Sequence, residues 1–225
     1  NGKWIAYWSD QSGEYEIWLQ DQQAGTSKKV SNFGKGMGWQ LFWSPDSKKL
    51  AYINHLQEIQ VLTVATGDIV TIDKTSLLSY SALRGFRLNW SADNNWIAFS
   101  KQVENLNSAI YVYGFADKKL HQLTAGYYND ADPVFDPGGK YLFFQTDRRL
   151  QPLYSGLDAT WIYPNTTQIA YASLEKKAKS LLVARNDEVK IAADTNTAAK
   201  PVATDKAAAP AAAAPAVKNI SVKPD

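Results

Sequence analysis

Two adjacent arginines, Arg148 and Arg149, are the side chains of this sequence best suited to binding a substrate group. They begin a stretch of about twenty residues, 147–167, between recognisable strands, and loops of that length are often functional. A guanidinium group can hold a carboxylate, such as the C-terminus of a peptide, through two parallel hydrogen bonds. We therefore predict that both arginines contact peptide. The alternative is that Asp147-Arg148 forms the common turn of a repeat, in which the arginine is structural.

No nucleophile motif accompanies these arginines. The sequence contains no G-x-S-x-G, no S-x-x-K with its supporting motifs and no H-E-x-x-H. Cysteine is absent, which excludes thiol catalysis, disulfides and cysteine-bound zinc. We expect the two histidines, His55 and His121, to be structural, because a histidine base also needs a nucleophile and an orienting carboxylate. The sequence thus predicts no catalytic residue in this chain.

Two acidic clusters and one glycine cluster are better explained as turns than as ligand sites. Residues 10–14 and 129–133 carry oxygen ligands at close spacing, but neither has the terminal glutamate of a calcium loop. The glycines at 34, 36 and 38 are not followed by the G-K-[ST] of a phosphate loop. We predict that these clusters are hairpin or connecting turns, with no metal site and no cofactor.

The elements that position these residues come from a repeat of about 45 residues. Four segments end in an aromatic residue, at Tyr7, Tyr52, Phe99 and Phe144, with spacings of 45, 47 and 45 residues. An aromatic and a turn precede three of the copies, as in Phe42-Trp43-Ser-Pro-Asp46. The first copy lacks this half, so we expect the chain to be a fragment of a longer protein.

Each unit has the pattern of short antiparallel strands. A turn at 44–47 is predicted to join strands 40–43 and 49–54, and a third and a fourth strand follow at 59–64 and 69–72. These strands are rich in β-branched and aromatic residues and do not show the 3.6-residue periodicity of a helical solenoid. Four strands per unit predict an all-β fold, a partial β-propeller of about four blades, with an ordinary β-sandwich as the alternative.

Repeats and composition together predict the domain boundaries. The propeller segment is expected over residues 1–190, with a low-complexity linker over 191–225 that leads to a further domain. The linker is rich in alanine and proline, and all aromatic residues precede it. The four units are expected at about residues 1–38, 39–85, 86–130 and 131–190.

Repeated aromatic residues have a structural explanation in this fold. Trp43, Trp90 and Phe135 occupy the same repeat position and are expected to pack one blade against the next. Trp8 and Trp39 lie outside the shared pattern, so we expect them to be freer to face solvent or a ligand.

Charge and hydropathy argue against two classes of partner. The sequence has 24 Lys and Arg against 22 Asp and Glu, a formal net charge of +2, which does not favour binding to nucleic acid or to an anionic membrane. No apolar run reaches the roughly 18 residues that a membrane span needs.

The repeat and the last unit carry a resemblance to known proteins. Residues 43–52, Trp-Ser-Pro-Asp-Ser-Lys-Lys-Leu-Ala-Tyr, resemble the PD40-type repeat that TolB-type propellers share with tricorn-type proteases. Residues 141–169 and 180–188 resemble the propeller region of bacterial tricorn protease homologues, which are serine peptidases of the S41 family. The likeness covers about residues 1–190 and is most specific over 136–188.

This resemblance implies a non-catalytic part of a peptidase. In that family, propellers precede a PDZ domain and a catalytic domain, and they act as channels and filters for peptide substrates. The expected partners are therefore peptides, the PDZ and catalytic domains of the same polypeptide, and further copies in a homo-oligomer. The resemblance implies a cytoplasmic location, with the periplasm as the alternative. Two other functions stay open: a stand-alone TolB-like protein-binding propeller, and the propeller of a prolyl-oligopeptidase-like enzyme.

Overall fold

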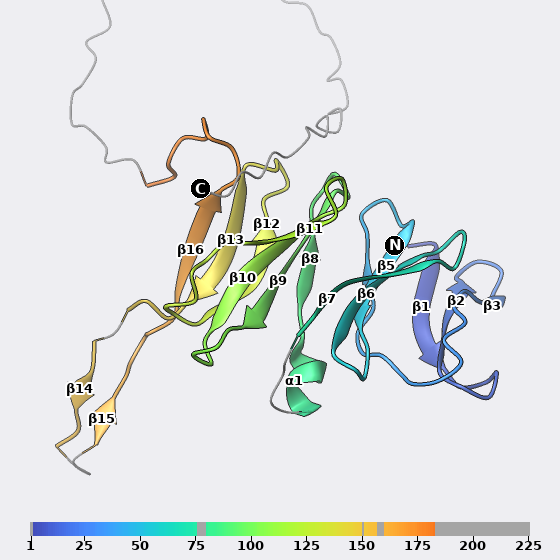
Figure 1. Ribbon diagram of the computed structural model, residues 1–225, viewed down its shortest axis with the longest axis horizontal. Helices are drawn as coiled ribbons and strands as arrows, with labels where there is room; N and C mark the ends of the chain where they lie inside the picture. Colours follow the sequence, from blue (N-terminus) through green and yellow to red (C-terminus); the bar gives the residue numbers. More distant parts are fainter. Residues whose placement is uncertain (1, 76–79, 150, 157–159, 183–225) are drawn as a thin grey trace, which may run out of the picture.

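Four antiparallel β-sheets lie side by side in an open arc in the computed structural model (Figure 1). The structure describes residues 2–75, 80–149, 151–156 and 160–182; the predicted linker lies outside them. The strands of the four sheets are, for the first sheet, β1 (Trp4–Ser9), β2 (Glu16–Asp21) and β3 (Ser27–Lys29); for the second, β4 (Phe42–Trp43), β5 (Lys49–Ile53), β6 (Glu58–Thr63) and β7 (Ile69–Lys74); for the third, β8 (Leu88–Trp90), β9 (Trp96–Gln102), β10 (Ser108–Gly114) and β11 (Lys119–Gln122); and for the fourth, β12 (Asp130–Phe135), β13 (Tyr141–Thr146) and β16 (Gln168–Ser173). This arrangement confirms the all-β class and the propeller-like architecture.

The predicted strands of the second and third units are confirmed, and each of these sheets has four strands in sequence order. The turn before β5 forms as expected. The Ser47 amide donates to the Ser44 carbonyl at 2.8 Å, and Ser47 adopts a φ of 60°. The Ser44 hydroxyl donates to the Asp46 carboxylate at 2.7 Å, which fixes the turn from within.

The first and fourth sheets differ from the four-strand pattern within the described residues. The first has three strands, β1, β2 and β3. β1 corresponds to β5 and β9, and no described strand takes the place that β4 and β8 have beside them. The fourth also has three, because β16 takes the place of the third strand and no described strand pairs with its other edge. One short helix, α1 (Tyr80–Gly85), connects the second sheet to the third and was not predicted from the sequence.

Apolar side chains fill the three boundaries between neighbouring sheets. One cluster joins the first and second sheets, a larger one the second and third, and a third the third and fourth. Trp90 is buried between the second and third sheets, where its ring stacks on Phe115 with centroids 5.4 Å apart. Its indole N–H donates to the Phe42 carbonyl of the second sheet at 3.2 Å. Phe135 is buried in the cluster between the third and fourth sheets. Trp43 packs against the cluster between the first and second sheets. The prediction that repeated aromatics pack between blades is therefore confirmed.

The expectation for Trp39 is wrong. Its side chain is only 8% exposed and belongs to the cluster between the second and third sheets. Its amide donates to the Ile53 carbonyl at 2.9 Å, which extends the pairing of β4 with β5 beyond the two residues of β4. Trp39 therefore behaves as a core residue of an extended inner strand, although the repeat pattern does not include it.

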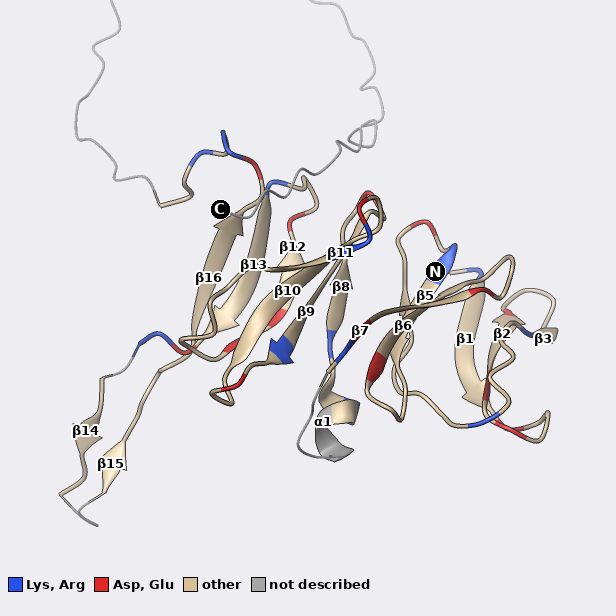
Figure 2. Cartoon of the chain, viewed as in Figure 1, with Lys and Arg blue, Asp and Glu red and all other residues tan. Residues whose placement is uncertain are grey.

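The sheets present one common end on which connecting loops gather. β5, β9 and β13 all end there, at the lower end of the sheets in Figure 1, and the loops 54–57, 103–107 and 123–129 follow or precede strands at this end. We call this end the loop face. Acidic and basic residues are interspersed along the described chain (Figure 2), so no large surface of a single charge forms.

Candidate functional site

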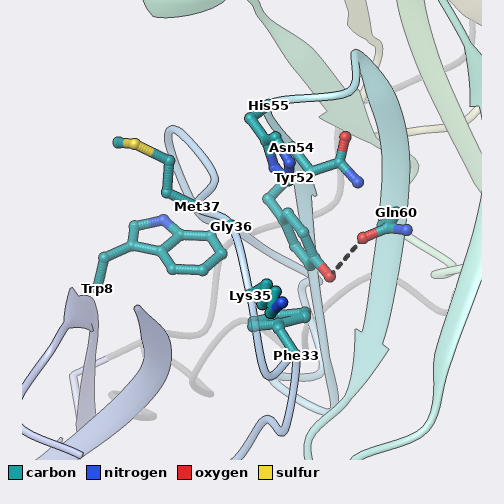
Figure 3. A pocket seen from close by; sticks show the side chains of 9 residues that line it. All are labelled: Trp8, Phe33, Lys35, Gly36, Met37, Tyr52, Asn54, His55 and Gln60. Carbon is teal, nitrogen blue, oxygen red and sulfur yellow. Dashed lines mark hydrogen bonds between the residues drawn. The ribbon is translucent and has the colours of Figure 1, made fainter. Parts of the chain in front are cut away.

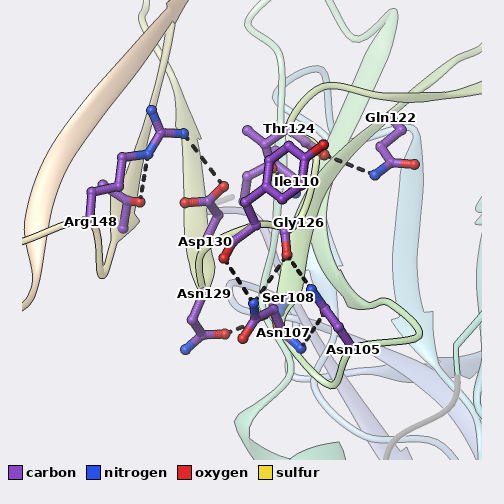
Figure 4. A network of polar contacts seen from close by, with 12 residues as sticks. Asn105, Asn107, Ser108, Ile110, Gln122, Thr124, Gly126, Asn129, Asp130 and Arg148 are labelled. Carbon is purple, nitrogen blue, oxygen red and sulfur yellow. Dashed lines mark hydrogen bonds and ion pairs between the residues drawn. The ribbon is translucent and has the colours of Figure 1, made fainter. Parts of the chain in front are cut away.

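Arg148 lies on the loop face, two residues after the end of β13. Its Nε donates to the Thr146 hydroxyl at 3.1 Å, and one Nη lies 3.8 Å from the Asp130 carboxylate (Figure 4). The guanidinium also lies over the Tyr128 ring, 5.3 Å from its centroid. The side chain is 45% exposed, so one side of the guanidinium is fixed by the protein and the other faces solvent.

Asp130 is the buried partner of this arginine. Its side chain is 1% exposed, and its Oδ1 accepts no hydrogen bond from the described residues. The prediction that residues 129–133 form a turn is wrong, because residues 130–133 belong to β12. Asp130 begins β12, opposite Thr146 of β13, and the ladder shifts register between Ala131 and Val134. Arg148, at the end of the neighbouring strand, provides the cation that faces this buried carboxylate.

Arg149 points to different partners. Its Nε donates to the Gln151 side chain at 3.2 Å, and its amide donates to the Thr166 carbonyl at 3.4 Å. The side chain is exposed. The two guanidinium groups therefore contact different residues and do not converge on one carboxylate. Arg148 is held by a buried acid, and Arg149 is the freer of the two.

The long stretch after Arg149 contains a hairpin that sequence reasoning missed. β14 (Leu153–Tyr154) pairs with β15 (Trp161–Ile162), and the hairpin extends away from the sheets (Figure 1). The Tyr154 and Trp161 rings meet edge to face at 5.6 Å, and both side chains are more than half exposed. Strands of two residues are too short to give a periodic signal in the sequence.

Asparagine side chains tie two loops of the loop face together. The amide nitrogens of Asn105 and Asn107 donate to the Gly126 carbonyl at 2.9 and 3.1 Å (Figure 4). Asn129 accepts from the Ser108 amide at 3.1 Å, and the Ile110 amide donates to the Thr124 hydroxyl at 2.9 Å. These bonds hold the loops 103–107 and 123–129 beside the start of β12, and hence beside Asp130.

A small aromatic-lined pocket lies at the boundary between the first and second sheets. Its cavity is about 30 Å³, which is enough for a water molecule but not for a peptide side chain (Figure 3). Trp8, Phe33 and Tyr52 pack against one another in it, with ring centroids 5.4 to 5.6 Å apart. The Trp8 indole N–H donates to the Trp39 carbonyl at 3.4 Å. Trp8 is thus half-buried and engaged in packing, with one edge on this pocket.

The chemistry of this pocket is that of a packed core. The Tyr52 hydroxyl donates to the Gln60 side chain at 2.9 Å, and burial, with Glu16 and Glu58 nearby, raises its pKa well above the ordinary value. The Glu16 carboxylate is 2% exposed and accepts hydrogen bonds from the Ser31 hydroxyl and from the Phe33 amide at 2.9 Å. The buried acid therefore anchors the loop that follows β3.

The two histidines lie in different places and have no nucleophile beside them in the described structure. The His121 imidazole lies beside the Trp96 ring and 2.8 Å from the Asp117 carboxylate. This hydrogen bond with His121 holds the pKa of Asp117 below its usual value. His55 lines the aromatic pocket and packs against Gly36, whose φ is +94°. Among the described residues, no three His, Asp or Glu side chains gather closely enough to hold a metal ion.

Comparisons with known proteins identify the family. The tricorn protease second beta propeller domain family matches residues 1–223. The chain belongs to this family. A sequence from Sulfurisphaera tokodaii described as a tricorn-like protease C-terminal subunit is 30% identical over 128 residues, which are 57% of this chain and 14% of that protein. A tricorn protease homolog of Saccharolobus solfataricus is 30% identical over 109 residues, which are 48% of this chain and 10% of that protein.

The crystal structure of the tricorn protease has the same fold over most of this tricorn propeller chain. It superposes with a TM-score of 0.69 at 17% identity and covers 80% of this chain and 18% of that one. This chain therefore corresponds to less than a fifth of the length of each of these three proteins. No helix among the described residues is long and apolar enough to cross a membrane.

Proposed function

We propose that this chain is the propeller segment of a tricorn-like serine peptidase of the S41 family, and that it controls which peptides reach a catalytic domain elsewhere in the same polypeptide. The observation that carries the proposal is the family match over residues 1–223. The described chain supplies a rigid array of sheets with loops gathered at one face, and this suits a channel or filter better than a site of bond cleavage.

The proposal includes an organisation of the whole protein. Residues 1–190 form the propeller segment, with blades at about 1–38, 39–85, 86–130 and 131–190, and residues 191–225 link it to the PDZ and catalytic domains. The assembled protein is a cytoplasmic homo-oligomer. A stand-alone TolB-like propeller is the less favoured alternative, because the family that matches the chain is the tricorn one.

Within this function, Arg149 is the residue that we propose to contact the carboxylate at the C-terminus of a peptide, with Arg148 beside it. Arg149 is exposed, and its guanidinium has donors left after its one bond to Gln151. Arg148 is partly committed to Asp130 and Thr146, so a peptide carboxylate competes with Asp130 for it.

The test uses the natural full-length protein and two peptides that differ only at the C-terminus, one with a free carboxylate and one amidated. Arg149→Ala is expected to lower kcat/KM for the free peptide by about threefold to tenfold, since an exposed charge-assisted bond is worth about 1 kcal/mol. Cleavage of the amidated peptide should be unchanged. Lys176→Ala, an exposed cation after β16 at the opposite end of the fourth sheet, is the matched control. Equal losses for both peptides would overturn the assignment of Arg149 without affecting the peptidase proposal.

A further inference from the structure

A polar groove at the edge of the third sheet is separate from the arginines discussed above. Its volume is about 540 Å³, which is within the usual range for small-ligand sites. The groove is formed by the end of β9, the loop 103–107, β10 and the end of β11, and its lining residues are Gln102, Val103, Glu104, Asn105, Tyr111, Gln122 and Ala125.

The side-chain amides of this lining are oriented by bonds to the backbone. The Gln102 amide nitrogen donates to the Leu106 carbonyl at 3.1 Å, and that of Gln122 donates to the Thr124 carbonyl at 2.9 Å. Asn105 donates to the Gly126 carbonyl at 2.9 Å and accepts from the Asn107 amide at 3.0 Å, so its side chain is held on both sides (Figure 4). Each of these bonds goes to the backbone, so the loop geometry itself fixes the direction of the amides.

Several acceptors stay available in this groove. A glutamine whose N–H₂ is bound to the backbone still has a carbonyl oxygen with two lone pairs, and this holds for Gln102 and Gln122. The Glu104 carboxylate is exposed and has no hydrogen bond or ion pair with any residue that the structure describes. Two amide oxygens and one free carboxylate therefore line a single groove, and they match a ligand that carries several donors and a positive charge.

Tyr111 adds an aromatic ring that already has one cation over it. Its ring stacks on Phe99 with centroids 6.3 Å apart, which fixes the ring in place. The Lys101 ammonium lies 5.6 Å from the Tyr111 centroid, but it is bound to both carboxylate oxygens of Asp73 at 3.0 Å. Asp73 therefore balances the charge of Lys101, which lowers the repulsion that a second cation meets in the groove.

We propose that this groove binds an arginine side chain of a polypeptide. A guanidinium is planar, stacks on aromatic rings and has five donors in a fixed geometry, which suits a carboxylate and two amide oxygens beside a tyrosine ring. An ammonium has a single compact charge and fits the spread acceptors less well. The proposal does not depend on capture of a peptide C-terminus by Arg149.

The experiment titrates the natural full-length protein with N-acetyl-arginine amide and with N-acetyl-citrulline amide, followed by saturation-transfer NMR. Citrulline has nearly the same shape but no charge, and neither probe has a free carboxylate. The arginine probe is expected to bind at least about threefold more tightly, and Glu104→Gln should remove this difference, because one exposed ion pair is worth up to about 1 kcal/mol. Glu14→Gln, an exposed glutamate in the loop between β1 and β2, is the matched control and should leave it unchanged.

Three results would overturn the proposal. They are equal binding of the two probes, an arginine preference that Glu104→Gln does not reduce, and equal effects of Glu104→Gln and Glu14→Gln. The second result would place arginine binding elsewhere in the protein. None of the three bears on the cleavage assay with free and amidated peptides.

Discussion

Replacing Arg148 with alanine removes the cation that faces the buried Asp130 carboxylate. Asp130 is 1% exposed, whereas Arg148 is 45% exposed, and the two charged groups are 3.8 Å apart. Loss of one partner of a fully buried ion pair costs about 3 to 5 kcal/mol, and exposed pairs contribute about 0 to 1 kcal/mol. This half-buried pair lies between those limits, so we expect Arg148→Ala to lower the free energy of unfolding by about 2 kcal/mol.

A second substitution separates the charge from the side-chain packing. Asp130→Asn keeps the shape of the side chain but removes the buried charge that Arg148 balances. In the Asp130→Asn background, Arg148→Ala should therefore cost only about 1 kcal/mol, the value of the lost hydrogen bond to Thr146. The coupling energy between the two sites would be about 1 kcal/mol.

The assay is urea unfolding of all four proteins of the cycle, followed by tryptophan fluorescence. Arg148→Lys is a further control, because it retains the charge but cannot donate in the same geometry. If the costs of Arg148→Ala are equal in the two backgrounds, the ion pair contributes nothing. The argument that Arg148 stabilises the buried charge of Asp130 would then be refuted.

Three further predictions concern stability. Trp90→Ala should lower the free energy of unfolding by about 3 to 5 kcal/mol, measured by urea unfolding, because it opens a cavity between the second and third sheets; a loss below about 1 kcal/mol would contradict this role. Gly38→Ala should cost about 1 to 3 kcal/mol and lower the thermal midpoint, since the added Cβ would collide with the Trp8 ring; an unchanged midpoint would show that the ring can move aside. Asp46→Asn should destabilise the protein at neutral pH and have no effect in strong acid. Partial burial opposes ionisation of Asp46, but hydrogen bonds from Ser44 and the Lys48 amide, with the nearby lysine charges, hold its pKa below 3.8 overall. The stabilisation that the Asp46 carboxylate provides is therefore present above that pH, and it is lost as the pH falls through the folded-state pKa. Chemical unfolding at several pH values checks this, and an effect independent of pH would contradict it.

The repeat explains why so much of the fold could be predicted from the sequence. The same turn and the same aromatic position recur in successive units, so the strands of the second and third sheets and the packing of Trp43, Trp90 and Phe135 followed from their spacing. Trp39 was misjudged because it lies outside the repeat, although it extends an inner strand and is buried.

The site was harder to predict because its geometry depends on contacts between strands and loops. Asp130 is paired with Arg148, which is 18 residues later in the chain, and a local reading of residues 129–133 predicts only a turn. The groove beside Glu104 depends on which atoms of Gln102 and Gln122 are already bonded to the backbone, and spacing gives no information about this. The sequence singled out Arg148 and Arg149, and their contact with peptide stays a prediction.

The most direct test of the proposed function uses the absence of cysteine from this chain. In the natural full-length protein, Arg149→Cys places a single thiol of this segment on the loop face, and Lys176→Cys places one at the opposite end. A bulky maleimide is attached to each, with equally treated unsubstituted protein as the control, and cleavage of an unstructured peptide is measured. If the propeller segment controls peptide access, the label at residue 149 slows cleavage and the label at residue 176 does not. Equal rates for the two labelled proteins and the control would contradict a gating role for this face.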